Sequence, residues 1–226
     1  MLATVAEHYP DLVREIHDAG HEIATHGYAH RLVYRMRPEE FEEDLVKSLK
    51  LIENVIGEKV VGHRAGYFSI TKQSLWALDI LAKHGIKYDS SIFPIRRRLY
   101  GIPDFPRFVS QVRSKGRYGL REVPPSTVRI WGQNVPIAGG GYLRVLPYWV
   151  IKQGIRRVNA QGHPAVIYLH PYELDPQDIK VPGVSLGWGT RFTQLSQRFN
   201  RSTFEGKLRK LLRDFKFGSV REVLDL

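Results

Sequence analysis

Amphipathic helix patterns alternate with short apolar segments along almost the whole chain of 226 residues, and this alternation constrains the fold most strongly. The helix patterns cover residues 10–20, 38–56, 71–84, 147–161 and 204–215. The segments interpreted as strands cover residues 21–25, 59–63, 86–92, 121–123, 127–131, 164–170 and 219–224. Helices between successive strands are typical of parallel sheets with crossover connections, so the order predicts an α/β fold.

Polar residues lie at the ends of several predicted strands. These residues are His26 and His30, Arg64, Asp89 and His170. Because the chemistry of parallel α/β folds sits at the carboxyl ends of strands, we expect these side chains to point to one rim.

The stretch HEIATHGYAH at 21–30 places His26 and His30 four residues apart, with Gly27 between them. Two imidazoles at this spacing can reach one Zn²⁺ ion from a single turn. The chain has no cysteine, so any metal site must use His, Asp and Glu. Two ligands are fewer than the three that catalytic zinc usually takes, and two surface histidines remain an alternative interpretation.

The other candidate residues also allow two interpretations each. His170 ends the most apolar predicted strand and is either a buried structural histidine or a general acid or base tuned by burial. Arg64 is either a surface cation or the orienting partner of a carboxylate. Asp89, in YDSS, is interpreted as a helix cap or a turn residue.

The net charge is +11, with basic clusters at 96–98 and 206–216. A basic, well-solvated surface is one interpretation, and an acidic partner such as nucleic acid, anionic lipid or anionic polysaccharide is the other. Neither cluster lies in a nucleic-acid-binding motif, so no nucleic-acid partner is expected. No apolar run reaches the ~18 residues of a membrane span, and the first residues lack the pattern of a signal peptide.

Three motifs resemble those of the polysaccharide deacetylases, the NodB-homology group or carbohydrate esterase family 4. HGYAH at 26–30 is similar to the family's His-(Ser/Thr)-x-x-His metal motif, with Gly27 in place of the hydroxyl residue. HRAGYF at 63–68 is similar to its Arg-x-Pro-Tyr motif, with Gly66 where proline is usual, and VIYLHP at 166–171 is similar to its final Leu-x-His motif. The stretches YDSSIFP, EVPPSTVRIWGQNVPIAGGGYLR and HPYELDP resemble the subgroup associated with exosortase and exopolysaccharide systems of Gram-negative bacteria.

The resemblance implies a distorted (β/α) barrel that forms a single domain over 1–226, with 171–226 as a subgroup-specific part. It implies a divalent metal, Zn²⁺ or Co²⁺ or another, and hydrolysis of the acetamide of an N-acetylated polysaccharide or oligosaccharide. By motif match His26 and His30 are metal ligands, His170 is the general acid and Arg64 orients the base. A backbone N–H near Tyr67 would help to hold the oxyanion.

One family motif has no match. The family's first strand ends in two aspartates, the general base and the third metal ligand, and no Asp-Asp pair occurs in the sequence. The resemblance therefore implies a barrel that lacks its first one or two β/α units, and we expect the chain as given to be inactive. The expected location is the cytoplasm or the periphery of the inner membrane.

Two non-catalytic functions are alternatives. One is a polysaccharide-binding protein that uses the aromatic faces of Trp131, Tyr142, Trp149 and Tyr172. The other is a basic interaction protein that uses 96–98 and 206–216.

Overall fold

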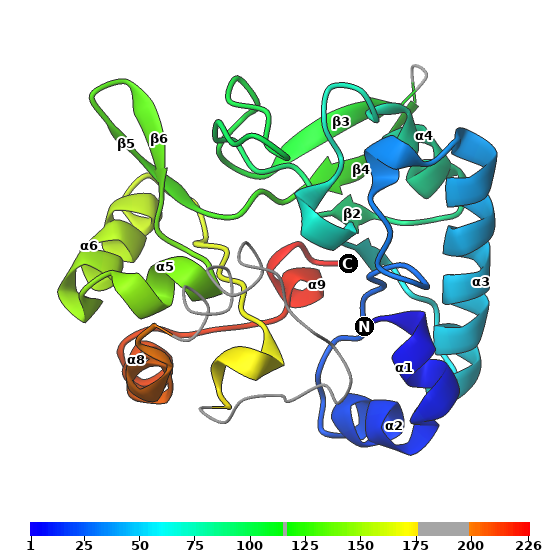
Figure 1. The fold of residues 1–226 in the computed structure, drawn as a ribbon, viewed down its shortest axis with the longest axis horizontal. Helices are drawn as coiled ribbons and strands as arrows, with labels where there is room; N and C mark the ends of the chain where they lie inside the picture. Colours follow the sequence, from blue (N-terminus) through cyan, green and yellow to red (C-terminus); the bar gives the residue numbers. More distant parts are fainter. Residues whose placement is uncertain (115–116, 176–198) are drawn as a thin grey trace, which may run out of the picture. The chain divides into compact units, whose positions relative to one another are not determined.

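The structure is a computed structural model that describes residues 1–114, 117–175 and 199–226. The chain divides into two compact units (Figure 1). The first unit comprises residues 1–124 and 218–226, and the second comprises residues 125–217. Both units combine helices with strands, as the alternating pattern predicts.

The first unit contains a sheet of four strands in the order β1-β2-β4-β3. These strands are β1 (Gly62–His63), β2 (Tyr88–Asp89), β3 (Ser110–Ser114) and β4 (Arg117–Glu122). Strands β1, β2 and β4 run parallel, and β3 is antiparallel to β4. A parallel bridge from Thr25 to His63 adds one more segment beside β1. The carboxyl ends of these parallel segments therefore share one edge of the sheet.

Helices cover this sheet, and the longest of them has the predicted bounds. The helices of the first unit are α1 (Ala3–His8), α2 (Pro10–Asp18), α3 (Pro38–Ile56), α4 (Trp76–Lys83) and α9 (Val220–Val223). Helix α3 packs against α1, α2 and α4 (Figure 1). It buries Phe41, Leu45 and Ile52, and it ends at Gly57, whose φ of 74° gives the left-handed C-cap that glycine favours.

The sequence prediction is wrong at the end of the chain, where helix α9 (Val220–Val223) stands in place of the strand predicted over 219–224. The cause is a capping box. Ser219 Oγ accepts a hydrogen bond from the Glu222 N–H at 3.2 Å, and the Glu222 carboxylate accepts one from the Ser219 N–H at 2.7 Å. Both groups satisfy donors that a helix start leaves unpaired, so the helical turn is favoured over an extended segment.

The second unit is built from a hairpin and three helices in its described part. These are β5 (Thr127–Ile130), β6 (Gln133–Pro136), α5 (Gly140–Val145), α6 (Tyr148–Asn159) and α8 (Phe204–Asp214). The hairpin turns at Trp131 and Gly132, whose φ values of 46° and 75° suit the primed turns that match strand twist. The predicted helices 147–161 and 204–215 are confirmed as α6 and α8.

Residues 164–170 do not form the predicted buried strand. The segment has no strand assignment, and its side chains are half-buried or exposed. It is attached at Val166, which accepts from the Ser126 N–H at 3.1 Å and donates to Ser126 Oγ at 2.7 Å. The pairing at Val166 is not followed by further strand pairing along the run, so the run is not part of a sheet. Within the described ranges, no helix is long and apolar enough to cross a membrane.

Candidate functional site

Two rows of side chains lie at the carboxyl ends of the parallel segments in the first unit. The first row is Thr25, His63, Asp89 and Glu122, which are register partners on adjacent segments. The second row consists of the residues that follow them, His26, Arg64, Ser90 and Val123. Successive side chains of an extended segment point to opposite faces, so the two rows serve opposite sides of the sheet.

The first row is a buried polar cluster beside helix α3. His63 Nδ1 lies 2.7 Å from Asp89 Oδ1, and the hydroxyl of Ser91 donates to the same oxygen at 2.6 Å. The His63 ring also meets the edge of Phe41 from α3, with ring centroids 6.0 Å apart. Asp89 therefore has a structural set of partners, and its side chain has no exposure to solvent.

Glu122 is the second carboxyl group of this row. Its Oε1 accepts from the Ile92 N–H at 2.8 Å, while its Oε2 is buried without a hydrogen-bond partner among the described residues. Burial, followed by the nearby negative charge of Asp89, raises the pKa of Glu122 well above its ordinary value. We conclude that Glu122 holds its proton in the folded protein.

Replacing Glu122 by glutamine is expected to stabilise the protein increasingly as the pH rises. The unfolded chain releases this proton near the ordinary pKa of 4.5, whereas the folded protein keeps it. The stabilising contribution of the native carboxyl is therefore complete below that pH and is lost as the pH rises through the folded pKa. Glutamine is neutral throughout, so the advantage of the variant grows by up to about 1.4 kcal/mol per unit of raised pKa.

Urea unfolding of the native protein and E122Q at about pH 5 and about pH 8 measures this difference in the free energy of unfolding. A difference that is the same at both pH values would contradict the assignment of a neutral Glu122.

The second row begins with His26, which is fixed by one ring nitrogen. His26 Nδ1 lies 2.5 Å from the carbonyl oxygen of Arg64, so it carries the proton and donates it to that carbonyl. Burial lowers the pKa of His26 to about 3. The ring is therefore a neutral imidazole whose Nε2 lone pair is available to a ligand, which is the usual arrangement of a metal-binding histidine.

His30 and Tyr67 complete this part of the site. The ring centroid of His30 lies 4.8 Å from that of His26 and 4.6 Å from that of Tyr67. His30, Tyr67 and Phe68 have φ values of 55°, 56° and 52°, in the left-handed region that residues other than glycine rarely adopt. Strained backbone of this kind gathers at functional sites, so its presence at His30 and in the turn at Tyr67 makes this region the candidate site.

Arg64 lies across the base of the same site. Its Nε donates to the carbonyl oxygen of Ser90 at 3.1 Å and its Nη2 donates to the Ser90 hydroxyl at 2.8 Å. The hydroxyl in turn donates to the Val123 carbonyl at 2.6 Å. These bonds tie Arg64 to strands β2 and β4 through residues that follow their carboxyl ends.

The imidazole pair matches two of the ligands that a divalent metal takes. Among residues 1–114, 117–175 and 199–226, no group of three or more His, Asp or Glu side chains is arranged to hold a metal ion. Within the described ranges the site therefore offers the two imidazoles of His26 and His30 but no third side chain of these types arranged with them. This is an incomplete set for catalytic zinc.

His170 belongs to the second unit and is described with it. Its side chain is 49% exposed, so the interpretation of a buried histidine is wrong. The reason is that the segment before it is not a buried strand. The ring stacks on Tyr172 with centroids 5.2 Å apart, and its backbone N–H donates to Glu173 Oε2 at 2.9 Å.

Behind His170 is a buried ion pair that the sequence did not reveal. Glu173 Oε1 lies 3.3 Å from Arg144 Nε, and the two side chains are only 1% and 7% exposed. Gly140 makes room for this pair, because a Cβ there would lie 1.5 Å from the Glu173 carboxylate. The His-x-x-Glu spacing of HPYE was the available signal, since Glu173 bonds back to the start of its own turn.

The comparisons with known proteins divide the chain at residue 89. Residues 1–89 match the polysaccharide deacetylase family, and residues 90–225 match a domain of unknown function, DUF3473. A peptidoglycan deacetylase of Helicobacter pylori is 34% identical over 86 residues, which cover 38% of this chain and 28% of that protein. A peptidoglycan deacetylase-like protein of Gibberella zeae is 32% identical over 94 residues, which cover 42% of this chain and 27% of that protein.

A solved structure described as a polysaccharide deacetylase of Mycobacterium smegmatis has a TM-score of 0.56 at 22% identity. The match covers 76% of this chain and 57% of that one, and it shows the distorted barrel fold of the deacetylases. The predicted fold class is therefore confirmed. The chain belongs to the DUF3473 family, whose model matches residues 90–225, and its residues 1–89 match the model of the polysaccharide deacetylase family.

The deacetylases are hydrolases that act on acetylated polysaccharides. His26, His30, Arg64 and Tyr67 lie in the part that matches this family, and His170 lies in the DUF3473 part. The chain spans 28% and 27% of the lengths of the two curated relatives.

Proposed function

We propose that the protein takes part in metal-dependent removal of acetyl groups from an N-acetylated polysaccharide during exopolysaccharide synthesis. The observation that supports this most directly is the imidazole pair. His26 and His30 lie 4.8 Å apart between ring centroids, and the His26 tautomer is set by the Arg64 carbonyl. A divalent metal such as Zn²⁺ or Co²⁺, when bound, would supply a Lewis acid next to the acetyl carbonyl.

The residues of this chain would then act in four ways. His26 and His30 hold the metal, and the turn at Tyr67 presents its backbone N–H to the oxyanion. That N–H donates no hydrogen bond to any residue in the described ranges, which leaves it available. His170 donates a proton to the leaving amine, a role that suits its exposed ring and its fixed backbone. Arg64 holds the Ser90 backbone in place beneath the pair.

We further propose that the 226-residue chain does not hydrolyse the amide without additional carboxylates. A general base must reach the attacking water, and the sequence contains no Asp-Asp pair. Asp89 and Glu122 are fully buried on the other face of their strands, so neither is a substitute. The protein would then bind the acetylated polysaccharide without modifying it, which is the second candidate function. The full exposure of Trp131 and the 68% exposure of Trp149 favour it, since both offer faces for sugar stacking.

Acetate release from N-acetylhexosamine oligomers, with Zn²⁺ or Co²⁺ added, tests the proposal. The assay compares the 226-residue chain with a version extended by in-frame upstream codons. We expect release by the extended version only, because a strand ending in two aspartates would supply both the base and the third ligand. Comparable release by the short chain would overturn the proposed inactivity. Binding of the oligomers without release by either version would instead support the binding function.

Calorimetry with Zn²⁺ adds a readout that does not depend on turnover. The 226-residue chain is expected to bind zinc weakly, and the double substitution of His26 and His30 by alanine is expected to remove that binding. His21→Ala is the matched control, because His21 is an exposed histidine of the same segment. Tight zinc binding that survives the double substitution would contradict the ligand assignment.

A further inference from the structure

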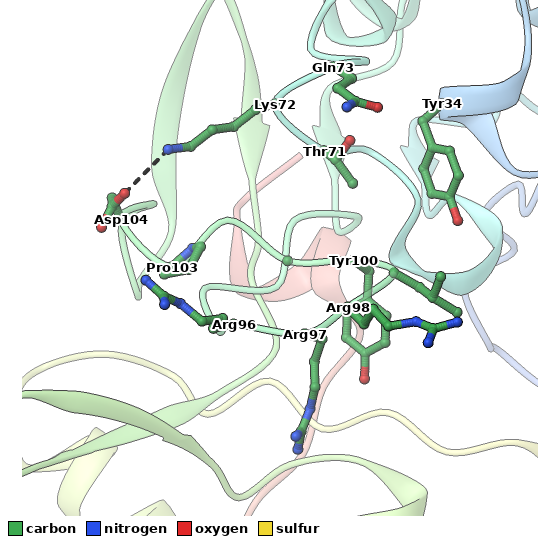
Figure 2. A pocket seen from close by; sticks show the side chains of 12 residues that line it. Tyr34, Thr71, Lys72, Gln73, Arg96, Arg97, Arg98, Tyr100, Pro103 and Asp104 are labelled. Carbon is green, nitrogen blue, oxygen red and sulfur yellow. Dashed lines mark hydrogen bonds and ion pairs between the residues drawn. The ribbon is translucent and has the colours of Figure 1, made fainter.

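A basic pocket of about 490 Å³ lies in the first unit (Figure 2). Its wall contains four cations, Lys72, Arg96, Arg97 and Arg98, against one carboxylate, Asp104. Lys72 and Asp104 form an ion pair with a separation of 3.3 Å, so the carboxylate does not neutralise the arginines. Two tyrosines, Tyr34 and Tyr100, also line the pocket. Cations beside aromatic rings suit a ligand that is both anionic and carbohydrate in nature.

The three arginines are exposed and come from one loop, and Figure 2 shows their side chains pointing in three different directions. Guanidinium groups that spread along a loop do not converge on one compact anion such as free phosphate. They match a ligand that carries several separated negative charges, and guanidinium pairs well with planar carboxylates.

The loop that carries the arginines is held firmly at its base. The N–H groups of Ile95 and Ile102 both donate to the carbonyl oxygen of Phe93, at 2.8 and 2.9 Å. Gly101 closes the loop with a φ of 97°, and a Cβ there would lie 2.2 Å from the Ile95 carbonyl oxygen. The two ends of the loop 96–101 are therefore held together by hydrogen bonds to the Phe93 carbonyl. A loop that is anchored in this way loses less freedom when a ligand binds.

A series of ring contacts links the pocket to the imidazole site. The Tyr100 ring packs on Phe68 with centroids 5.9 Å apart. Phe68 follows Tyr67 in the same turn, and the ring of Tyr67 contacts His30 at 4.6 Å. The Tyr67 side chain is 62% exposed, so a ligand at the imidazoles can extend along it. A polymer bound at His30 that follows these rings would reach the arginine loop.

We infer that this pocket binds acidic sugar residues, and that the polysaccharide handled at the imidazole site carries carboxylate groups. The inference rests on the proposed function, because it names the class of polymer at that same site. It concerns binding alone, so its failure and the failure of acetate release are separate results.

The test is the affinity of the protein for oligogalacturonate, a chain of uronic acids, with a neutral N-acetylglucosamine oligomer for comparison. We expect tighter binding of the acidic oligomer, and weaker binding at higher salt because the charges are exposed. The double variant Arg96→Gln/Arg98→Gln should lose about tenfold in affinity for the acidic oligomer and little for the neutral one.

The double variant Lys50→Gln/Lys87→Gln is the matched control, since both lysines are exposed cations of the first unit outside the pocket. It removes the same charge and should keep the native affinity. An equal loss in both double variants would overturn the inference and would indicate general attraction to a basic surface. Equal or tighter binding of phosphatidylglycerol vesicles or single-stranded DNA, abolished by the arginine substitutions, would also overturn it. Circular dichroism checks that all variants are folded.

Discussion

Replacing His170 by alanine in the upstream-extended version is expected to lower turnover by roughly 10²–10⁴-fold, the usual contribution of a general acid. The leaving amine of an amide must gain a proton before it departs, and His170 presents a half-exposed ring for this purpose. The metal content should not change, because the proposed ligands lie in the other unit. Initial rates of acetate release, measured together with bound zinc, separate these two effects.

His163→Ala is the control for this substitution. It removes an imidazole from the start of the same segment, and we expect turnover close to that of the native protein. Near-native turnover in H170A itself would mean that His170 has no catalytic role. Loss of the alkaline limb of the pH–rate profile in H170A would separate proton transfer from a loss of packing against Tyr172.

Replacing Arg144 by methionine is expected to destabilise the second unit by about 3–5 kcal/mol. The substitution leaves the Glu173 carboxylate buried without its cation, and burying an unpaired charge is far more costly than losing an exposed ion pair. Chemical unfolding followed by tryptophan fluorescence gives the free energy of unfolding.

A surface pair of the same chemistry provides the comparison. Arg209 and Glu205 lie 2.7 Å apart on α8, with side chains 77% and 58% exposed. We expect Arg209→Met to change the stability little, because water screens exposed pairs. If R144M and R209M were equally stable, the buried pair would not hold the His170 turn in place.

The sequence was most informative where a local pattern decides the structure. Helix α3 has the predicted bounds because its apolar stripe and the glycine after it are both local signals. The rule that polar residues gather at the ends of parallel strands correctly placed His26 and Arg64 together. Both residues could be identified because each directly follows a short apolar segment.

Partners that are distant in sequence could not be predicted. The neighbour of Asp89 in the buried row is Glu122, and only the pairing of β2 with β4 brings them side by side. The same holds for Arg144 and Glu173. At 164–170 the sequence predicted a structure that does not form. The apolar composition of this run favours a buried strand, but its pairing with Ser126 involves Val166 and does not continue along the run. Part of the predicted subgroup-specific segment 171–226 lies outside the described residues.

The alternation of the two rows has a consequence for insertions and deletions. Each parallel segment contributes one side chain to the interior beside α3 and the next one to the imidazole face. A single residue lost before Thr25 would put the His26 imidazole into the core position, and one lost before His63 would put the Arg64 guanidinium there. The register of the parallel segments therefore fixes the buried polar row and the imidazole site together, so a shift of one shifts the other.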